Sequence, residues 1–166
     1  MAGTDVILSP QYMLSCDTAN YGCDGGYLDL AWNFLESTGT VAETCNPYVS
    51  DTGLVPICPT NNLCSDNVTT PTVYKCAAGS VVHPTSVAGI KAEIYNNGPV
   101  EASFNVYNDF FSYSSGVYRH VRGRLVGGHA IKIIGWGVEN RRAFWLCANS
   151  WGTSWGMQGY FKIQQG

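Results

Sequence analysis

The sequence has few charged residues and no long apolar run. Asp, Glu, Lys and Arg make up 13% of its 166 residues, whereas soluble domains usually have about a quarter, and 45% are hydrophobic. This composition argues against a disordered chain and favours a packed core in one domain or two small lobes. No apolar stretch approaches the length of about 18 residues that predicts a transmembrane helix. Met1–Thr4 do not match a secretory signal sequence, so we expect any signal to lie upstream of Met1 or not to be encoded.

An excess of positive charge is also lacking. Nine basic and twelve acidic residues give a formal net charge of -3, which argues against nucleic acid as a partner of the whole chain. The one basic cluster is Arg119–Arg124. We interpret it as a solvated hairpin rather than an anion site.

The seven cysteines lack the spacing of a zinc site. No Cys-x2-Cys pair occurs, and no histidine lies near the five cysteines between residues 16 and 64. That segment is rich in Gly, Pro, Asn, Thr and Asp, so it buries little apolar area and gains from covalent cross-links. We therefore predict disulfides and an oxidising compartment, with no metal and no cofactor. The glycosylation sequon Asn67-Val68-Thr69 gives slight support to a secretory route.

The first half of the sequence predicts short helices among loops. Ser9-Pro10 offers an N-cap and a proline at the first helical position, which predicts a helix through about Leu14. Apolar residues recur at helical spacing over residues 27–35, and Gly39 is expected to end this helix. Residues 45–72 have no clean period and indicate a long, cross-linked loop.

The second half predicts one helix and several strands. Residues 85–96 form an amphipathic pattern that ends before Gly98-Pro99, with Val87, Ile90 and Ile94 on one face. Alternation indicates a strand from Val100 to Val106. Further strands are expected over residues 130–136, 143–148 and 160–164. The chain therefore divides into a helical, disulfide-rich part, 1–75, and a β-rich part, 76–166.

Two polar residues at the ends of predicted strands indicate nucleophilic catalysis. His129 follows Gly127-Gly128, and Asn149 begins the segment Asn149-Ser150-Trp151-Gly152. A histidine oriented by an amide and covered by an indole forms two of the three parts of a thiol-protease site. The third part is a cysteine in a Cys-Gly-Ser/Ala-Cys-Trp/Tyr segment far upstream of the histidine. The 166 residues contain no such segment.

Several motifs in a fixed order resemble the papain family of cysteine peptidases, and its cathepsin B-like branch in particular. The match runs from about Ile7 to Gly166 and rests on Leu8–Asp17, Gly22–Gly26, Asn97–Ala102, Gly116–His120, Gly128–Ala130 and Asn149–Gly152. The resemblance implies an α+β, papain-like fold with a helical left lobe and a β-barrel-like right lobe. Because the nucleophile segment is not in the sequence, we expect a partial fold with an incomplete left lobe.

The resemblance also implies roles for individual residues. His129 would be the general base, Asn149 would accept a hydrogen bond from its imidazole, and Trp151 would shield that bond. Gly25, Gly26 and Gly128 would line the path of an extended peptide, although Gly25 and Gly26 could instead serve only a tight turn. We expect Trp155 to belong to the core.

Disulfide pairs come from the resemblance as well. It implies the pairs Cys16–Cys58 and Cys45–Cys64, and it leaves Cys23 unpaired or bridged to another chain. Cys76 has no partner that the pattern names. Cys147 lies among Phe144, Trp145 and Leu146, so we expect an unpaired, buried thiol there rather than a nucleophile.

We therefore predict a cathepsin B-like cysteine peptidase that hydrolyses peptide bonds by a Cys-His-Asn mechanism, with the 166 residues inactive by themselves. One alternative is the heavy chain of a two-chain peptidase. Another is a non-catalytic papain-like protein that binds peptides or serves as a scaffold. The segment from Cys45 to Cys64 contains no histidine, which argues against the carboxydipeptidase activity of cathepsin B.

The expected partners are a peptide or protein substrate and either a light chain or a second copy bound at an exposed apolar groove. We expect no nucleic acid and no membrane. The family and the cysteine content imply a lysosomal, vacuolar or secreted protein.

Overall fold

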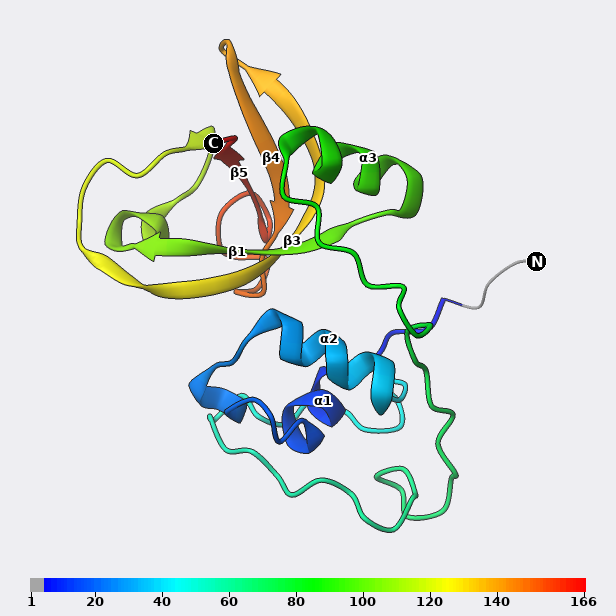
Figure 1. Ribbon diagram of the computed structural model, residues 1–166. Helices are drawn as coiled ribbons and strands as arrows, with labels where there is room; N and C mark the ends of the chain where they lie inside the picture. Colours follow the sequence, from blue (N-terminus) through cyan, green and yellow to red (C-terminus); the bar gives the residue numbers. More distant parts are fainter. Residues whose placement is uncertain (1–4) are drawn as a thin grey trace. The chain divides into compact units, whose positions relative to one another are not determined.

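The computed structural model describes residues 5–166, which form parts of two compact units (Figure 1). The first unit ends at Val82 and the second begins at His83, so the boundary lies later than the expected division after residue 75. The reason is that the intervening segment still bonds to the first unit. Thr40 and Tyr74 exchange two backbone hydrogen bonds of 2.9 and 2.7 Å, and the amide of Cys76 donates to the carbonyl of Leu35.

Three short helices form the start of the first unit. Helix α1, Pro10–Cys16, begins after Ser9, whose hydroxyl accepts the amide of Tyr12 as an N-cap. The 3-10 helix η1, Gly22–Asp24, precedes α2, Leu28–Ser37. Gly39 has φ +84° and donates its amide to the carbonyl of Phe34, so it ends α2 as the sequence predicts.

Loops and disulfides make up the rest of the first unit. Disulfides join Cys16 to Cys58 and Cys45 to Cys64, which are the pairs that the resemblance implies. Val41 packs with Cys45 and Cys64 in a small buried cluster. Residues 45–72 contain no helix or strand, in agreement with the predicted loop.

The second unit is a five-stranded sheet with one helix on it. The bounds of the strands are Val100–Tyr107 for β1, Val117–Tyr118 for β2, Leu125–Glu139 for β3, Arg142–Ala148 for β4 and Tyr160–Gln164 for β5. The strands lie in the order β1-β3-β4-β5-β2. Helix α3, Val87–Asn97, packs against β1 and β3 (Figure 1).

A largely aromatic core fixes this sheet. Phe110 and Phe161 are fully buried, and Ile90 and Ile94 of α3 pack against the same cluster. Val87, expected on that apolar face, is the first residue of the helix and is 38% exposed, so it contributes little to the core. None of the helices within residues 5–166 has the length and apolar character needed to cross a bilayer.

The hairpin expected around Arg119–Arg124 is wrong. The preceding strand β2 pairs in parallel with β5, not with the following strand β3. The segment is a loop that the carboxylate of Asp109 holds in place. That carboxylate accepts the amides of Val121 and Arg122 at 2.9 and 3.0 Å.

Candidate active site

The sheet brings His129 and Asn149 together. His129 lies on β3, and Asn149 directly follows β4, which pairs with β3 from Lys132 opposite Ala148 onward. The Nε2 atom of His129 lies 2.8 Å from Oδ1 of Asn149. The amide of Ser150 donates to the same Oδ1 at 2.9 Å, and the amide of Asn149 donates to the carbonyl of Gly159.

This geometry fixes the proton on the imidazole ring. Because the amide of Ser150 donates to it, the side-chain atom of Asn149 that faces the ring is the oxygen, which can only accept. Nε2 of His129 therefore carries a proton and donates it to that oxygen. In a neutral ring, Nδ1 then holds the free lone pair and can take up a proton. The pair thus presents a base whose tautomer is set by a neutral amide.

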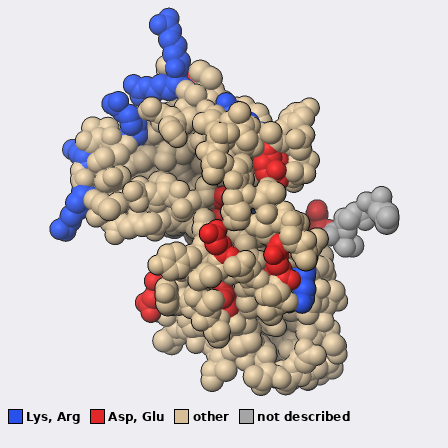
Figure 2. All heavy atoms as spheres, viewed as in Figure 1, with Lys and Arg blue, Asp and Glu red and all other residues tan. Residues whose placement is uncertain are grey.

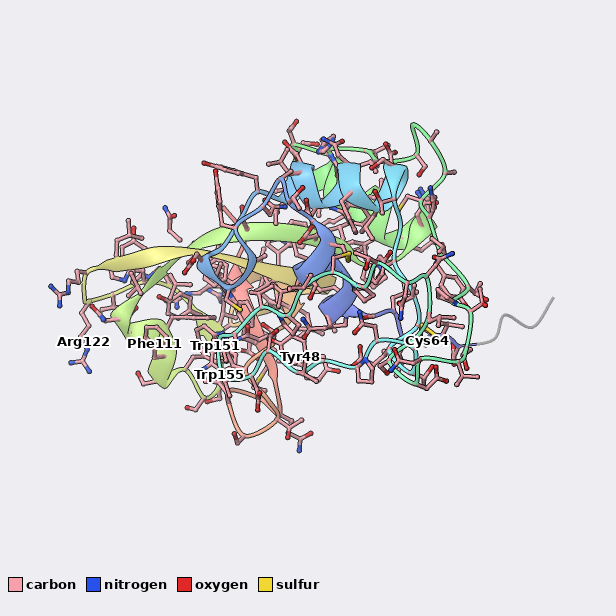
Figure 3. The ribbon with its side chains drawn as sticks, turned by 90° about the horizontal axis from the view of Figure 1, so that it is seen from below. Tyr48, Cys64, Phe111, Arg122, Trp151 and Trp155 are labelled. Atoms are coloured by element: carbon pink, nitrogen blue, oxygen red, sulfur yellow. A yellow bond between two sulfur atoms is a disulfide. The ribbon has the colours of Figure 1, made fainter. Side chains whose placement is uncertain are left out.

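Aromatic rings surround the imidazole. The indole of Trp151 lies 5.0 Å from the ring of His129, and Phe104 on β1 lies 6.1 Å from it, opposite His129 in the β1–β3 register. Trp151 itself stacks on Phe111 at 5.2 Å with an interplanar angle of 10° (Figure 3). Rings this close to the imidazole fit the expected shielding of the bond between His129 and Asn149 from water, which stays a prediction.

Other residues singled out in the sequence have structural partners. Trp155 packs against the buried cluster and donates from Nε1 to the carbonyl of Phe111 at 3.1 Å, which fits the expected core role. His120 stacks on Tyr107 and lies 3.2 Å from Oδ1 of Asp109. It takes no part in the pair formed by His129 and Asn149.

The three glycines expected to line a peptide path lie on both units. Gly128 on β3 is exposed, and an added Cβ there would meet no atom within 4 Å. In the first unit, Gly25 ends η1 with φ +105°, and Gly26 leaves room for Asn20, whose Oδ1 accepts the amide of Tyr27 at 2.7 Å. The local backbone and packing thus account for glycine at positions 25 and 26. Contact with a substrate stays a prediction for all three glycines.

The free cysteines in the described part of the chain differ sharply in their exposure to solvent. Cys147 on β4 is fully buried between β3 and β5, and burial raises the pKa of its thiol to about 12. Cys23 is exposed and Cys76 is half-buried, and neither forms a disulfide. Within residues 5–166, no three His, Cys, Asp or Glu side chains gather as a metal site would require.

Sequence reasoning missed the two phenylalanines that complete the aromatic surroundings. Phe104 alternates correctly on its strand, but only the register of β1 against β3 puts it opposite His129. Phe111 lies in the 3-10 helix η2, Asn108–Ser112, which no periodicity in the sequence marks. Its stacking on Trp151 depends on long-range folding.

The chain is similar to proteins of a known family. The papain family of cysteine proteases matches residues 1–166. The chain is 43% identical to a gut-specific cysteine proteinase of Caenorhabditis elegans, over 96% of the chain and 54% of that protein. It is 42% identical to cathepsin B-like CP3 of Giardia intestinalis, over 98% of the chain and 55% of that protein. The chain thus spans about half the length of the curated relatives it matches.

Solved structures show the same fold. Procathepsin B S9 from Trypanosoma congolense matches 97% of the chain and 55% of that structure, with a TM-score of 0.84 and 37% identity. The proform of the ragweed allergen Amb a 11, a cysteine protease, matches 99% of the chain and 48% of that structure, with a TM-score of 0.79 and 28% identity. The predicted partial α+β, papain-like fold is confirmed. The chain belongs to the papain family of cysteine proteases, within its cathepsin B-like branch.

Proposed function

We propose that this chain supplies the general base and its orienting amide to a cysteine peptidase that hydrolyses peptide bonds. The observation that carries the proposal is the hydrogen bond of 2.8 Å from Nε2 of His129 to Oδ1 of Asn149. It leaves Nδ1 as the proton acceptor on an imidazole that aromatic rings shelter. Family membership supports the same chemistry, and it suggests peptides or proteins as substrates.

In the proposed reaction, Nδ1 of His129 takes the proton of a cysteine thiol. The resulting thiolate attacks the carbonyl carbon of the scissile peptide bond, and the imidazolium then gives its proton to the leaving amine. Hydrolysis of the acyl-enzyme by water returns the free thiol. Asn149 keeps the ring oriented throughout. Because its amide is neutral, it leaves the imidazolium charge free to stabilise the thiolate.

The proposed nucleophile is not one of the seven cysteines of this chain. Four of them form disulfides, and burial raises the pKa of Cys147 far above neutrality. Cys23 and Cys76 do not lie in the Cys-Gly-Ser/Ala-Cys-Trp/Tyr setting of the family nucleophile. We therefore expect the catalytic thiol on polypeptide outside these 166 residues, and we expect the 166 residues to be inactive by themselves.

The test compares the 166-residue chain with the product of the complete gene on a dipeptidyl fluorogenic substrate. Only the complete product should show turnover that requires a reduced thiol. His129→Ala in that product should lower kcat/KM by about 10³-fold or more, since members of a catalytic unit act together. Asn149→Ala should cost less, because the base remains. His83→Ala, at an exposed histidine of the same unit, is the matched control and should leave activity unchanged.

Two outcomes would contradict the proposal. Thiol-dependent turnover by the 166 residues alone would mean that one of their own cysteines is the nucleophile. Peptide binding by the complete product without any turnover would favour the alternative of a non-catalytic, papain-like binding protein.

A two-chain form of the peptidase is a second candidate, and the exposed, free thiol of Cys23 favours it. In that form Cys23 would bridge to a light chain that carries the nucleophile. Electrophoresis of native protein with and without reductant tests this, because reduction should release a smaller chain. The disulfides also support a lysosomal, vacuolar or secreted location, where oxidised cysteines persist.

A further inference from the structure

The only Asn-x-Ser/Thr sequon of the sequence, Asn67-Val68-Thr69, lies in the first unit on an exposed turn. Such a sequon on a surface loop is an acceptor for N-linked sugar in a secreted protein. We propose that Asn67 carries an N-linked oligosaccharide. The proposal does not depend on the catalytic role of His129.

A short, anchored turn presents Asn67. Its amide donates to the carbonyl of Cys64 at 2.9 Å, and the amide of Cys64 donates to the carbonyl of Thr69 at 2.8 Å. Cys64 is buried and disulfide-bonded to Cys45. Asn67 itself has φ +59°, a left-handed conformation that asparagine adopts more readily than most residues. The disulfide therefore fixes one side of the turn while Asn67 stays at the surface.

The side-chain amide of Asn67 is free at the atom that would bear the sugar. Its Oδ1 accepts a hydrogen bond from Nδ2 of Asn61 at 3.3 Å. Its Nδ2 donates to no acceptor in the described part of the chain. A bond from Nδ2 to a sugar would therefore disturb no hydrogen bond of the folded turn.

The surroundings of Asn67 would gain from a hydrophilic cover. Asn67 borders an open concavity of about 350 Å³ whose lining includes Ile57, Leu63 and Pro71. Ile57 is 91% exposed, and Val68, next to Asn67, is 80% exposed. Exposed apolar side chains of this kind favour association, whereas a glycan is bulky and solubilising.

The proposed transfer links Nδ2 of Asn67 to the anomeric carbon of a lipid-pyrophosphate-linked oligosaccharide. The bond from that carbon to the pyrophosphate oxygen breaks, the lipid pyrophosphate leaves with the electron pair, and the amide loses one proton. In the folded turn the hydroxyl of Thr69 donates to Oδ2 of Asp66 at 2.6 Å, so it is not available to the amide of Asn67. Transfer therefore precedes closure of the turn, in the compartment where the disulfides form.

The test is peptide mapping of the protein isolated from its own cells and of the complete gene product secreted by a eukaryotic host. Treatment with peptide-N-glycosidase should remove the mass of one oligosaccharide and leave an aspartate at position 67. The variants Asn67→Gln and Thr69→Ala should both lack that added mass. Thr69→Ser is the matched control, because it keeps both the sequon and a hydroxyl that can reach Asp66, and it should retain the sugar.

The readout does not require the variants to fold. Sugar transfer precedes closure of the turn, so retained and secreted fractions are both mapped and both report on position 67. An unmodified Asn67 in protein from its own cells, beside glycosylated proteins of the same secretory route, would overturn the proposal. An added mass that survives in both Asn67→Gln and Thr69→Ala would equally overturn it.

Discussion

The two units of this chain reach stability by different means. In the described part of the first unit, the sheet-like contacts are isolated bridges such as Leu8–Ala42 and Thr40–Tyr74, and two disulfides join its loops. The second unit has a five-stranded sheet around a cluster of eight buried residues. A region that buries little apolar surface depends on cross-links, whereas one with a dense aromatic core does not.

Charge separates the two units as well. Residues 1–82 contain eight acidic side chains and one lysine, whereas residues 83–166 contain four acidic side chains and eight lysines or arginines. On the faces shown in Figure 2, basic side chains accordingly gather on the second unit. The modest net charge of the sequence is therefore the sum of two regions of opposite sign. It argues against nucleic acid as a partner of the chain as a whole, but it does not describe either unit separately.

Removal of the disulfides should have the largest effect, and it should destabilise the first unit alone. The two bridges close sequence separations of 42 and 19 residues, which correspond to about 4 and about 3 kcal/mol of stabilisation in the chain-entropy account. Reductant at neutral pH should therefore abolish the protection of first-unit amides in hydrogen exchange and leave the strands of the second unit protected. Cys23→Ser, at a free thiol, is the matched control. Simultaneous loss of protection in both units would show that they unfold as one.

A truncation in the aromatic core should have the converse effect. Phe110 is fully buried, and its ring lies 5.0 Å from those of Phe104, Phe161 and Trp155. Phe110→Ala should lower the free energy of unfolding of the second unit by about 3–5 kcal/mol. Phe110→Leu should cost less, because it leaves a smaller cavity.

Tryptophan fluorescence during denaturation can follow this change, since four of the five tryptophans lie in the second unit. The ring of Phe110 also lies 5.5 Å from that of Trp151, so the variant should weaken the shelter around His129. An unchanged denaturation midpoint would contradict the assignment of Phe110 to the centre of the core.

The free thiols should report the same contrast on a smaller scale. Cys147 is fully buried, so Cys147→Ser places a hydroxyl in an apolar site and should cost about 1–3 kcal/mol. Cys147→Ala has no hydroxyl to satisfy and should be the more stable of the two variants. In the native protein, iodoacetamide should label Cys23 and spare Cys147, as mass spectrometry can show. Rapid labelling of Cys147 would mean that β4 is not enclosed.

Much of this molecule could be predicted from local sequence patterns. The N-cap at Ser9, the stop at Gly39 and the alternation along β1 each depend on a few neighbouring residues. Likewise His129 and Asn149 could be singled out because glycines and tryptophans flank them in a specific order.

Long-range pairings could not be predicted in this way. The parallel pairing of β2 with β5 joins segments more than forty residues apart, and β2 has only two residues, too few for any periodicity. The stacking of Phe111 on Trp151 likewise depends on where η2 lies after folding. Local sequence patterns do not determine the strand register or the packing between segments that are distant in the chain.

The two units nevertheless share one device, a carboxylate that organises a loop. In the second unit, partial desolvation acts to raise the pKa of Asp109, but hydrogen bonds from the amides of Arg122 and Val121 and from Tyr118 and His120 outweigh it and hold that pKa well below its ordinary value. In the first unit, hydrogen bonds from the hydroxyl and amide of Thr69, then from the amide of Val68, lower the pKa of Asp66.

Acid should therefore weaken both loops, with the larger effect in the second unit. A carboxylate whose pKa is lower in the folded state stabilises the fold above its unfolded pKa of about 3.9, and that contribution is lost as the pH falls toward the folded value. Between about pH 5 and 7, protonation of Asp109 should thus have no effect on the melting temperature. At pH values below about 4, the melting temperature should decrease. Asp109→Asn should reduce this decrease of the melting temperature at acid pH for the second unit. Asp66→Asn should have the same but weaker effect for the first unit. A decrease that is unchanged in Asp109→Asn would mean that other carboxylates, and not this shared device, set the response of the second unit to acid.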